Sequence, residues 1–439
     1  MRQAAERVAG RAAGRPLRGL SVWAGRFERV TRPVPALLRD PAFRRYFLAR
    51  TSSHLGDGLI PVALLFGALR LGASPTELGL VLLAGRLPVV VFTLVGGVVG
   101  DVLSRRAVML AADVVRCASQ GLTAALLVTG VATLWHLAAL QAVAGAAHAF
   151  FTPAAAGLVA DIVPEAQRRQ ANALVTTTQN AATLVAPVVS AALVAAVGAG
   201  VSFAVDAVTF AISAAALVAL KAPDRSVPRR PALLTAARHG WRDFRTRPWL
   251  QATTVQVAVI NGVCISPFLV LGPVIAEQRL GGPLAWVLIG NGYAAGALLG
   301  SALALRWRPR RPLRVAVTIP AALAPLLVLL AAGAPVWALA AAAVPAGVQS
   351  ALYAVLTETA RQVHVPADLV ARATGLSTVV GLAAAPAGMA LAGPAAERVG
   401  THAVLLTGAL VAVLSAPLAL AVRSVRQLPA DGAPRGQNA

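Results

Sequence analysis

Charged residues are scarce in this sequence, and lysine and cysteine are almost missing from it. Asp, Glu, Lys and Arg make up 13% of the 439 residues, whereas hydrophobic residues make up 57%. Soluble globular proteins contain about 25% charged residues, so the composition excludes an ordinary soluble domain. The two cysteines, Cys117 and Cys264, lie inside apolar runs, which excludes a disulfide framework and a cysteine metal site. We expect both to be small core residues.

The sequence has instead a series of apolar runs separated by Gly, Pro and Arg. Each run is long enough to cross a bilayer as a helix, which takes roughly 17–25 residues. We therefore predict an all-α membrane protein with twelve transmembrane helices in two six-helix bundles. The predicted spans are residues 43–70, 76–101, 107–130, 134–161, 168–197, 200–221, 249–276, 283–306, 313–332, 335–360, 368–396 and 400–422.

The basic residues predict the orientation of these spans. Lys and Arg number 39 against 17 Asp and Glu, and they concentrate in the two tails, in a central linker and in alternate turns. Cytoplasmic loops carry such an excess, so we expect both termini to face the cytoplasm of a bacterial inner or plasma membrane. No basic stretch is interleaved with aromatic residues, so we expect no nucleic-acid partner.

The polar segments divide the chain into five parts. We expect a basic cytoplasmic tail at 1–42, bundles at 43–222 and 249–423, a basic cytoplasmic linker at 223–248 and a cytoplasmic tail at 424–439. The first part lacks the apolar core of a secretory signal. Three interpretations of it stay open: a helix on an anionic membrane surface, a disordered tail, or a start codon assigned too early.

The two halves repeat one pattern between their fourth and fifth spans. The first half has "DIVPEAQRRQANAL" (161–174) and the second has "RQVHVPADLVARATGL" (361–376), each with Val-Pro, an acidic residue and then arginine. Such repeats are typical of secondary transporters, whose substrate cavity lies between the halves near the bilayer midplane.

Several segments carry a family resemblance: "SSHLGDGLIPVAL" (52–64), "GGVVGDVLSRR" (96–106), "AADVVRCA" (111–118) and "TETARQVHVPADLVARATG" (357–375). With them the chain resembles the major facilitator superfamily over residues 43–423. More narrowly, it resembles the bacterial efflux branch that includes enterobactin and macrolide exporters. The resemblance implies a twelve-helix fold and a loop that latches one conformation by pairing with neighbouring helix ends. The latch residues would be Gly97, Asp101, Arg105 and Arg106; the alternative is that the two arginines only set topology.

The chain departs from the family pattern at two places. The family loop has arginine directly after the aspartate, where this sequence has Val102. The proline-glycine motif of span five is reduced to "APVVSAA" around Pro187, with Ala186 and Ser190 where glycines are usual. The second departure weakens the inference of antiport and leaves the fold prediction untouched.

Charged residues inside the spans predict the functional site. Asp57 and Arg86 lie near the middles of spans one and two, and at ~1.5 Å rise per residue they reach similar depths. An ionised group there is costly, so it faces a cavity or a partner. We hypothesise that Asp57 carries a proton or contacts the substrate and is balanced by Arg86. A static structural pair is the alternative.

Other polar residues in the spans have weaker assignments. Asp113 and Arg116 are three residues apart and predict a structural ion pair within one helix. Asp206 is expected either to line the cavity, as a second candidate for proton and substrate binding, or to be hydrogen-bonded at a helix interface. The remaining candidates are Gln141 and His148 on one face of span four, and the pair Glu358 and Arg361, a second gate suggested by the repeat.

These observations predict a secondary active transporter rather than an enzyme. The sequence has no ATP-binding loop and no catalytic constellation, and we expect no cofactor and no metal. The leading hypothesis is a monomer that exports an amphipathic drug, siderophore or secondary metabolite by alternating access, coupled to protons. An importer or facilitator of the same fold, and a non-transporting scaffold or sensor, are the alternatives.

Overall fold

In the computed structural model, helices and short turns make up the described part of the chain, and no strand occurs there. The described residues are 37–221, 244–307, 309–365 and 367–429, with side chains described outside 93–102, 367–380 and 382.

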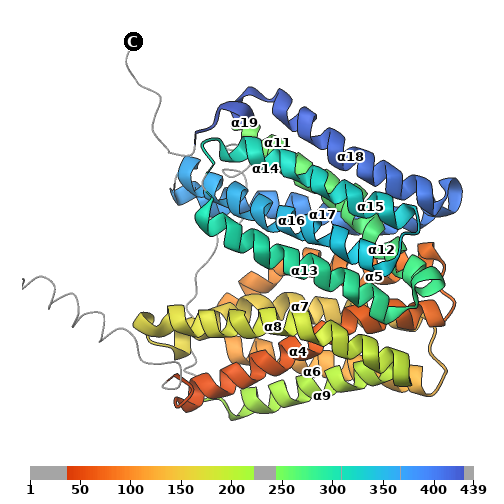
Figure 1. Cartoon of the computed structure of the whole chain (residues 1–439). Coiled ribbons are helices and arrows are strands. Elements are labelled where there is room, and N and C mark those ends of the chain that lie inside the picture. The colour runs from red at the N-terminus through yellow and green to blue at the C-terminus, as the bar shows by residue number, and fades with distance from the viewer. Residues whose placement is uncertain (1–36, 222–243, 308, 366, 430–439) are drawn as a thin grey trace, which may run out of the picture.

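The first six membrane segments form one bundle (Figure 1). Each is a single continuous helix, and each begins and ends within a few residues of the predicted span. The helices are α4 (Pro41–Arg70), α5 (Pro75–Val102), α6 (Arg105–Val128), α7 (Leu134–Ile162), α8 (Glu165–Val197) and α9 (Ala199–Ala219).

The second bundle contains six further segments, followed by the short helix α19 (Arg423–Gln427). Two of its segments change helix type, which the apolar pattern did not predict. The seventh comprises α11 (Pro248–Val259), the π-helix η1 (Ile260–Ile265), α12 (Ser266–Ile275) and the π-helix η2 (Ala276–Leu280). The ninth comprises α14 (Pro312–Thr318), the 3₁₀-helix η3 (Ile319–Leu323) and α15 (Ala324–Ala331). The others are α13 (Pro283–Arg306), α16 (Val336–His364), α17 (Ala367–Val399) and α18 (Thr401–Ala421).

The predicted twelve-span fold is thus confirmed. Within the described residues, eleven segments are long and apolar enough to cross a membrane. Small residues let the helices approach closely, as is common between membrane helices. At the contact of α13 with α16, for example, a Cβ added to Gly347 would overlap the carbonyl oxygen of Tyr293.

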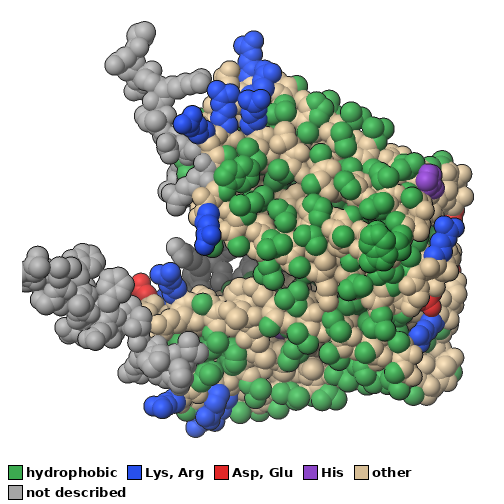
Figure 2. Space-filling model, viewed as in Figure 1, with side chains coloured by type: hydrophobic (Ala, Val, Ile, Leu, Met, Phe, Trp, Pro, Cys, Tyr) green, Lys and Arg blue, Asp and Glu red, His purple; other side chains and the backbone are tan. Residues whose placement is uncertain are grey.

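The hydrophobic core shows that the bundles meet at one end and separate at the other. One cluster joins both bundles, including Leu78 of α5 and Val270 of α12. At the other end each bundle has its own cluster, around Met109 in the first and Leu313 in the second. Figure 2 shows a hollow between the bundles, opening on the edge where Lys and Arg side chains gather. We call these the closed end and the basic end.

The closed end is held by direct backbone contact between the two bundles. Helix α5 begins there and packs along α17. The backbone N–H of Thr76 donates to Oε1 of Glu397 over 3.3 Å. A Cβ added to Gly393 would overlap the backbone of Thr76, so the helices approach as closely as a glycine allows. A cavity between the bundles is therefore reached from the basic end.

Candidate functional site

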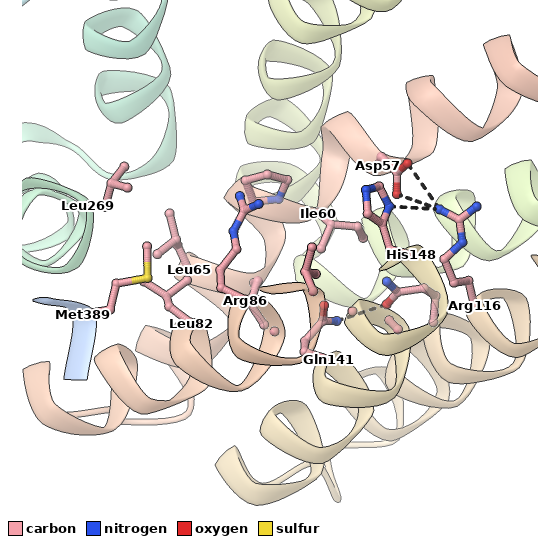
Figure 3. A pocket seen from close by; sticks show the side chains of 17 residues that line it. Asp57, Ile60, Leu65, Leu82, Arg86, Arg116, Gln141, His148, Leu269 and Met389 are labelled. Carbon is pink, nitrogen blue, oxygen red and sulfur yellow. Dashed lines mark hydrogen bonds and ion pairs between the residues drawn. The ribbon is translucent and has the colours of Figure 1, made fainter. Parts of the chain in front are cut away.

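A cavity of about 260 Å³ lies where the two bundles meet, mostly against the first. We call it the central cavity; Figure 3 shows its lining. Four helices of the first bundle contribute its polar side chains, and the second bundle adds two apolar ones, Leu269 and Met389. The polar lining residues are Asp57, Arg86, Arg116, Gln120, Gln141 and His148.

Arg116 of α6 is the most constrained of these residues, because its side chain is only 2% exposed. Its guanidinium lies between two aromatic rings, 4.3 Å from the centroid of Phe151 and 4.1 Å from that of Phe210. Nη2 donates to Asp113 Oδ1 over 2.5 Å and to Ser53 over 3.1 Å. The expected pair of Asp113 and Arg116 is therefore present, one helical turn apart.

Asp113 is held as tightly as its partner. It is fully buried, and the hydroxyl of Ser213 in α9 donates to its second oxygen. Burial of two charges is favourable only when both are paired and their remaining atoms are hydrogen-bonded. Asp113 thus provides a full counter-charge for Arg116, and no acid of the cavity is needed for that purpose.

Asp57 of α4 interacts with Arg116 much more loosely. Both carboxylate oxygens lie 3.4 Å from Arg116 Nη1, longer than the roughly 2.7–2.9 Å of a strong charge-assisted bond. The Asp57 side chain is 34% exposed. The expected partnership of Asp57 with Arg86 is wrong for this conformation. Among the described residues, Arg116 is the arginine that pairs with Asp57. Equal depth in the membrane did not reveal which helix faces α4.

Arg86 of α5 lines the same cavity but forms no ion pair or hydrogen bond with the described residues. In the view of Figure 3 it lies between Leu269, Leu65 and Met389 on one side and the cluster around Asp57 on the other. His148 Nδ1 lies 3.5 Å from Arg116, and its Nε2 lies 3.4 Å from the hydroxyl of Thr152. The site candidates Asp57, Arg86 and His148 thus share one cavity.

Gln141 lines the cavity and makes a contact that the sequence did not predict. Its Nε2 donates to Oε1 of Gln120 over 3.1 Å, and both amides are buried. The pair links α7 to α6. Gln141 and His148 do lie on one face of α7, as their seven-residue spacing indicates.

Asp206 of α9 does not line the central cavity. It is fully buried, and its Oδ1 accepts from the hydroxyl of Thr209 over 3.3 Å. A Cβ added to Gly56 would overlap this carboxylate, so α4 packs directly on it. Its Oδ2 has no hydrogen-bond partner within the described structure. Of the two expected placements, the helix interface is the observed one.

Arg105 and Arg106, expected in a loop, are the first residues of α6 and contact the ends of other helices in their own bundle. Arg105 pairs with Asp161 at 2.9 Å and donates to the carbonyl of Gly157 near the end of α7. Arg106 donates to two carbonyls at the end of α9, where the helix dipole favours a cation. Gly97 and Asp101 lie within α5, and the side chain of Asp101 is outside the described ones.

Two further expected sites have local contacts. Glu358 and Arg361 form an ion pair of 2.9 Å within α16. Pro187 lies inside α8, and the residues around it pack against α4: the Ser190 hydroxyl donates to the carbonyl of Leu59 over 2.7 Å. The motif therefore serves here as a contact between spans one and five. No group of three His, Cys, Asp or Glu that could hold a metal occurs among the described residues.

Known proteins resemble this chain in sequence and in fold. The Major Facilitator Superfamily model matches residues 46–389. The multidrug efflux pump Tap of Mycolicibacterium fortuitum is 30% identical over 414 residues, 89% of this chain and 97% of that protein. Tap of Mycobacterium tuberculosis H37Rv is 27% identical over 89% of this chain and 95% of that protein.

Solved structures share the fold at low sequence identity. A peptide transporter in complex with sulfate has a TM-score of 0.68 at 13% identity, covering 88% of this chain and 95% of that one. A bacterial Spinster homologue in an inward-facing, occupied conformation has a TM-score of 0.64 at 14% identity, covering 89% and 99%. The fold and the family match agree, and this chain is a membrane transporter of the major facilitator superfamily.

Proposed function

We propose that the chain exports amphipathic small molecules in exchange for protons, and that Asp57 is the group for which proton and substrate compete. The main support is that the two carboxylates next to Arg116 differ in burial and in how closely they pair with it. Asp113 is buried and tightly paired, whereas Asp57 is partly exposed in the central cavity and loosely paired. Two relatives named as multidrug efflux pumps support the direction of transport.

The charge distribution supports an orientation in which the basic end faces the cytoplasm of a bacterium. In that orientation both termini and the linker between the bundles are cytoplasmic. The conformation described above then opens inward, so that a substrate from the cytoplasm or the inner leaflet reaches the central cavity. Nothing in the site needs a second subunit, so we propose that a monomer carries out transport.

Exchange at Asp57 follows from the local electrostatics. When Asp57 takes a proton, Arg116 keeps the Asp113 counter-charge, so no buried cation is left unpaired. When Asp57 loses the proton, its carboxylate attracts a cationic group of the substrate. The titratable and charged groups around Asp57 are Arg50 and His54 on its own helix, Arg86, Asp113, Arg116, His148 and Asp206.

The contacts at the basic end support a role in switching. We propose that the junction between α5 and α6, residues 97–106, and the Glu358–Arg361 pair rearrange when the bundles close at this end. Arg105 and Arg106 would then exchange their helix-end contacts, and Asp101 would join the latch. The ion pairs Arg105–Asp161 and Glu358–Arg361 are partly exposed, so breaking and re-forming them costs little free energy.

The proposal is tested in liposomes that contain the purified protein. An imposed pH gradient should drive ethidium, a lipophilic cation, against a counter-flow of protons measured with an internal pH dye. Asp57→Asn should lose the coupling, and Glu165→Gln, an exposed acid outside the cavity, should keep it. Dye movement that ignores the gradient would instead support a facilitator. No movement of ethidium or of any substrate tested would support a scaffold or sensor.

A further inference from the structure

The central cavity presents two opposite charges that the protein itself leaves incompletely satisfied. Asp57 has a 34% exposed side chain and a long contact to Arg116. Arg86 is exposed, lines the cavity and has no ion pair among the described residues. The two lie on different helices, α4 and α5, and both line the same cavity (Figure 3).

The unpaired state of Arg86 is the more unusual of the two. It lies about 16 Å from the start of α5 by helical rise, well inside the membrane span. A charged side chain at such depth pairs with another group or faces a functional cavity. Asp113 cannot serve it, because that carboxylate is buried with Arg116 and Ser213. Arg86 is therefore available for an anion in the cavity.

The walls around these charges are apolar. Leu65 and Leu82 of the first bundle and Leu269 and Met389 of the second line the same cavity. Methionine and leucine side chains adapt to varied apolar shapes, which suits a site that accepts different molecules. A ligand that satisfies the whole cavity carries a cation, an anion and an apolar body.

We propose that the central cavity selects amphipathic zwitterions, with the cationic group on Asp57, the anionic group on Arg86 and the apolar body against the leucines and Met389. This inference rests on the proposed function and names its substrate class. A simple anion fits exchange poorly, because it binds best when Asp57 is protonated and so travels with the proton. A zwitterion keeps the competition at Asp57, and Arg86 adds affinity over a simple cation.

A pair of matched dyes tests the proposal by equilibrium binding. Rhodamine 110 and rhodamine 123 share one cationic ring system, but the first has a free carboxylate where the second has a methyl ester. Fluorescence anisotropy would measure their affinities for the protein in nanodiscs of zwitterionic lipid. The wild type should bind rhodamine 110 roughly tenfold more tightly, as expected of one charge-assisted contact.

The variants separate the two charges. Arg86→Gln should abolish the preference for rhodamine 110 without weakening rhodamine 123, since the variant removes a positive charge from the cavity; retained binding of rhodamine 123 also shows that the variant is folded. Arg86→Lys should keep part of the preference. Asp57→Asn should weaken both dyes by a similar factor and keep their ratio. Arg306→Gln, an exposed arginine at the end of α13, is the matched control and should change nothing.

Equal affinities of the two dyes for the wild type, a preference that survives in Arg86→Gln, or a lack of binding by both dyes would overturn the zwitterion proposal. Binding is measured without a gradient, so it stands or falls independently of transport. Coupled ethidium transport together with equal dye affinities would defeat the zwitterion site alone. A dye preference that depends on Arg86, without coupled transport, would defeat the exchange mechanism alone.

Discussion

Replacement of Asp113 should destabilise the protein far more than the same replacement at Asp57. Asp113→Asn removes the main counter-charge of Arg116, whose side chain is 2% exposed and lies between two aromatic rings. The remaining partner, Asp57, is 3.4 Å away. Breaking a buried pair by removing one partner costs about 3–5 kcal/mol, because it leaves a buried charge uncompensated.

Asp57→Asn should be mild by the same reasoning. Its side chain is 34% exposed, its contact is long, and Arg116 keeps Asp113. A partly exposed pair of this kind contributes about 1 kcal/mol or less. The free energy of unfolding should therefore fall by several times more in Asp113→Asn than in Asp57→Asn.

Reversible unfolding in mixed micelles, with increasing SDS and tryptophan fluorescence as the signal, would measure both values. The double replacement Asp113→Leu with Arg116→Met removes both charges and should recover much of the loss, since apolar residues of similar size can replace a buried pair. Equal losses in the two aspartate variants would refute the assignment of Asp113 as the main partner.

Three other changes test different parts of the molecule. Gly393→Val places a Cβ against the α5 backbone and should prevent closure at that end, which spin-label distances across the closed end would report as a shift toward separation. Arg105→Gln loses its ion pair to Asp161 and should lower the transport rate with little change in substrate affinity, whereas an unchanged rate would exclude a switching role. Gln141→Leu leaves the buried amide of Gln120 unpaired and should cost about 1–3 kcal/mol in SDS unfolding, a loss that replacing both glutamines should reduce.

The sequence was sufficient for the spans and for the local ion pairs. Apolar length identifies each membrane helix, and a spacing of three residues places Asp113 beside Arg116 and Glu358 beside Arg361, because both pairs depend only on helix geometry. Span five was predicted to begin at residue 168, whereas α8 begins at Glu165 after a proline.

Contacts between helices could not be predicted from the sequence. The depth of Asp57 and Arg86 was a sound clue to a shared cavity, but depth gives no rotation about the helix axis. In the structure, the side chain beside Asp57 is instead that of Arg116, which is 59 residues away in the sequence. No local pattern in the sequence predicted the two rings around Arg116 or the contact with the amide of Gln120. Phenylalanines in an apolar span have the same pattern whether they face lipid or pack on a buried arginine.

The helix irregularities of the second bundle were likewise hidden. The π-helix Ile260–Ile265 contains Asn261, whose side chain donates to the carbonyl of Gly381 in α17. π-Helical segments often occur at functional sites, but hydropathy alone does not distinguish them from an α-helical membrane span. Prolines such as Pro267 and Pro320 mark the places where the regular bonding changes.

The most direct test of exchange at Asp57 is to count the protons that leave the purified protein when a substrate binds. A weakly buffered sample with a pH indicator would be mixed with ethidium across the acidic to neutral range. If proton and substrate compete at Asp57, proton release persists in His148→Gln and disappears in Asp57→Asn. Binding without proton release at any pH in that range, or release that persists in Asp57→Asn, would contradict exchange at Asp57.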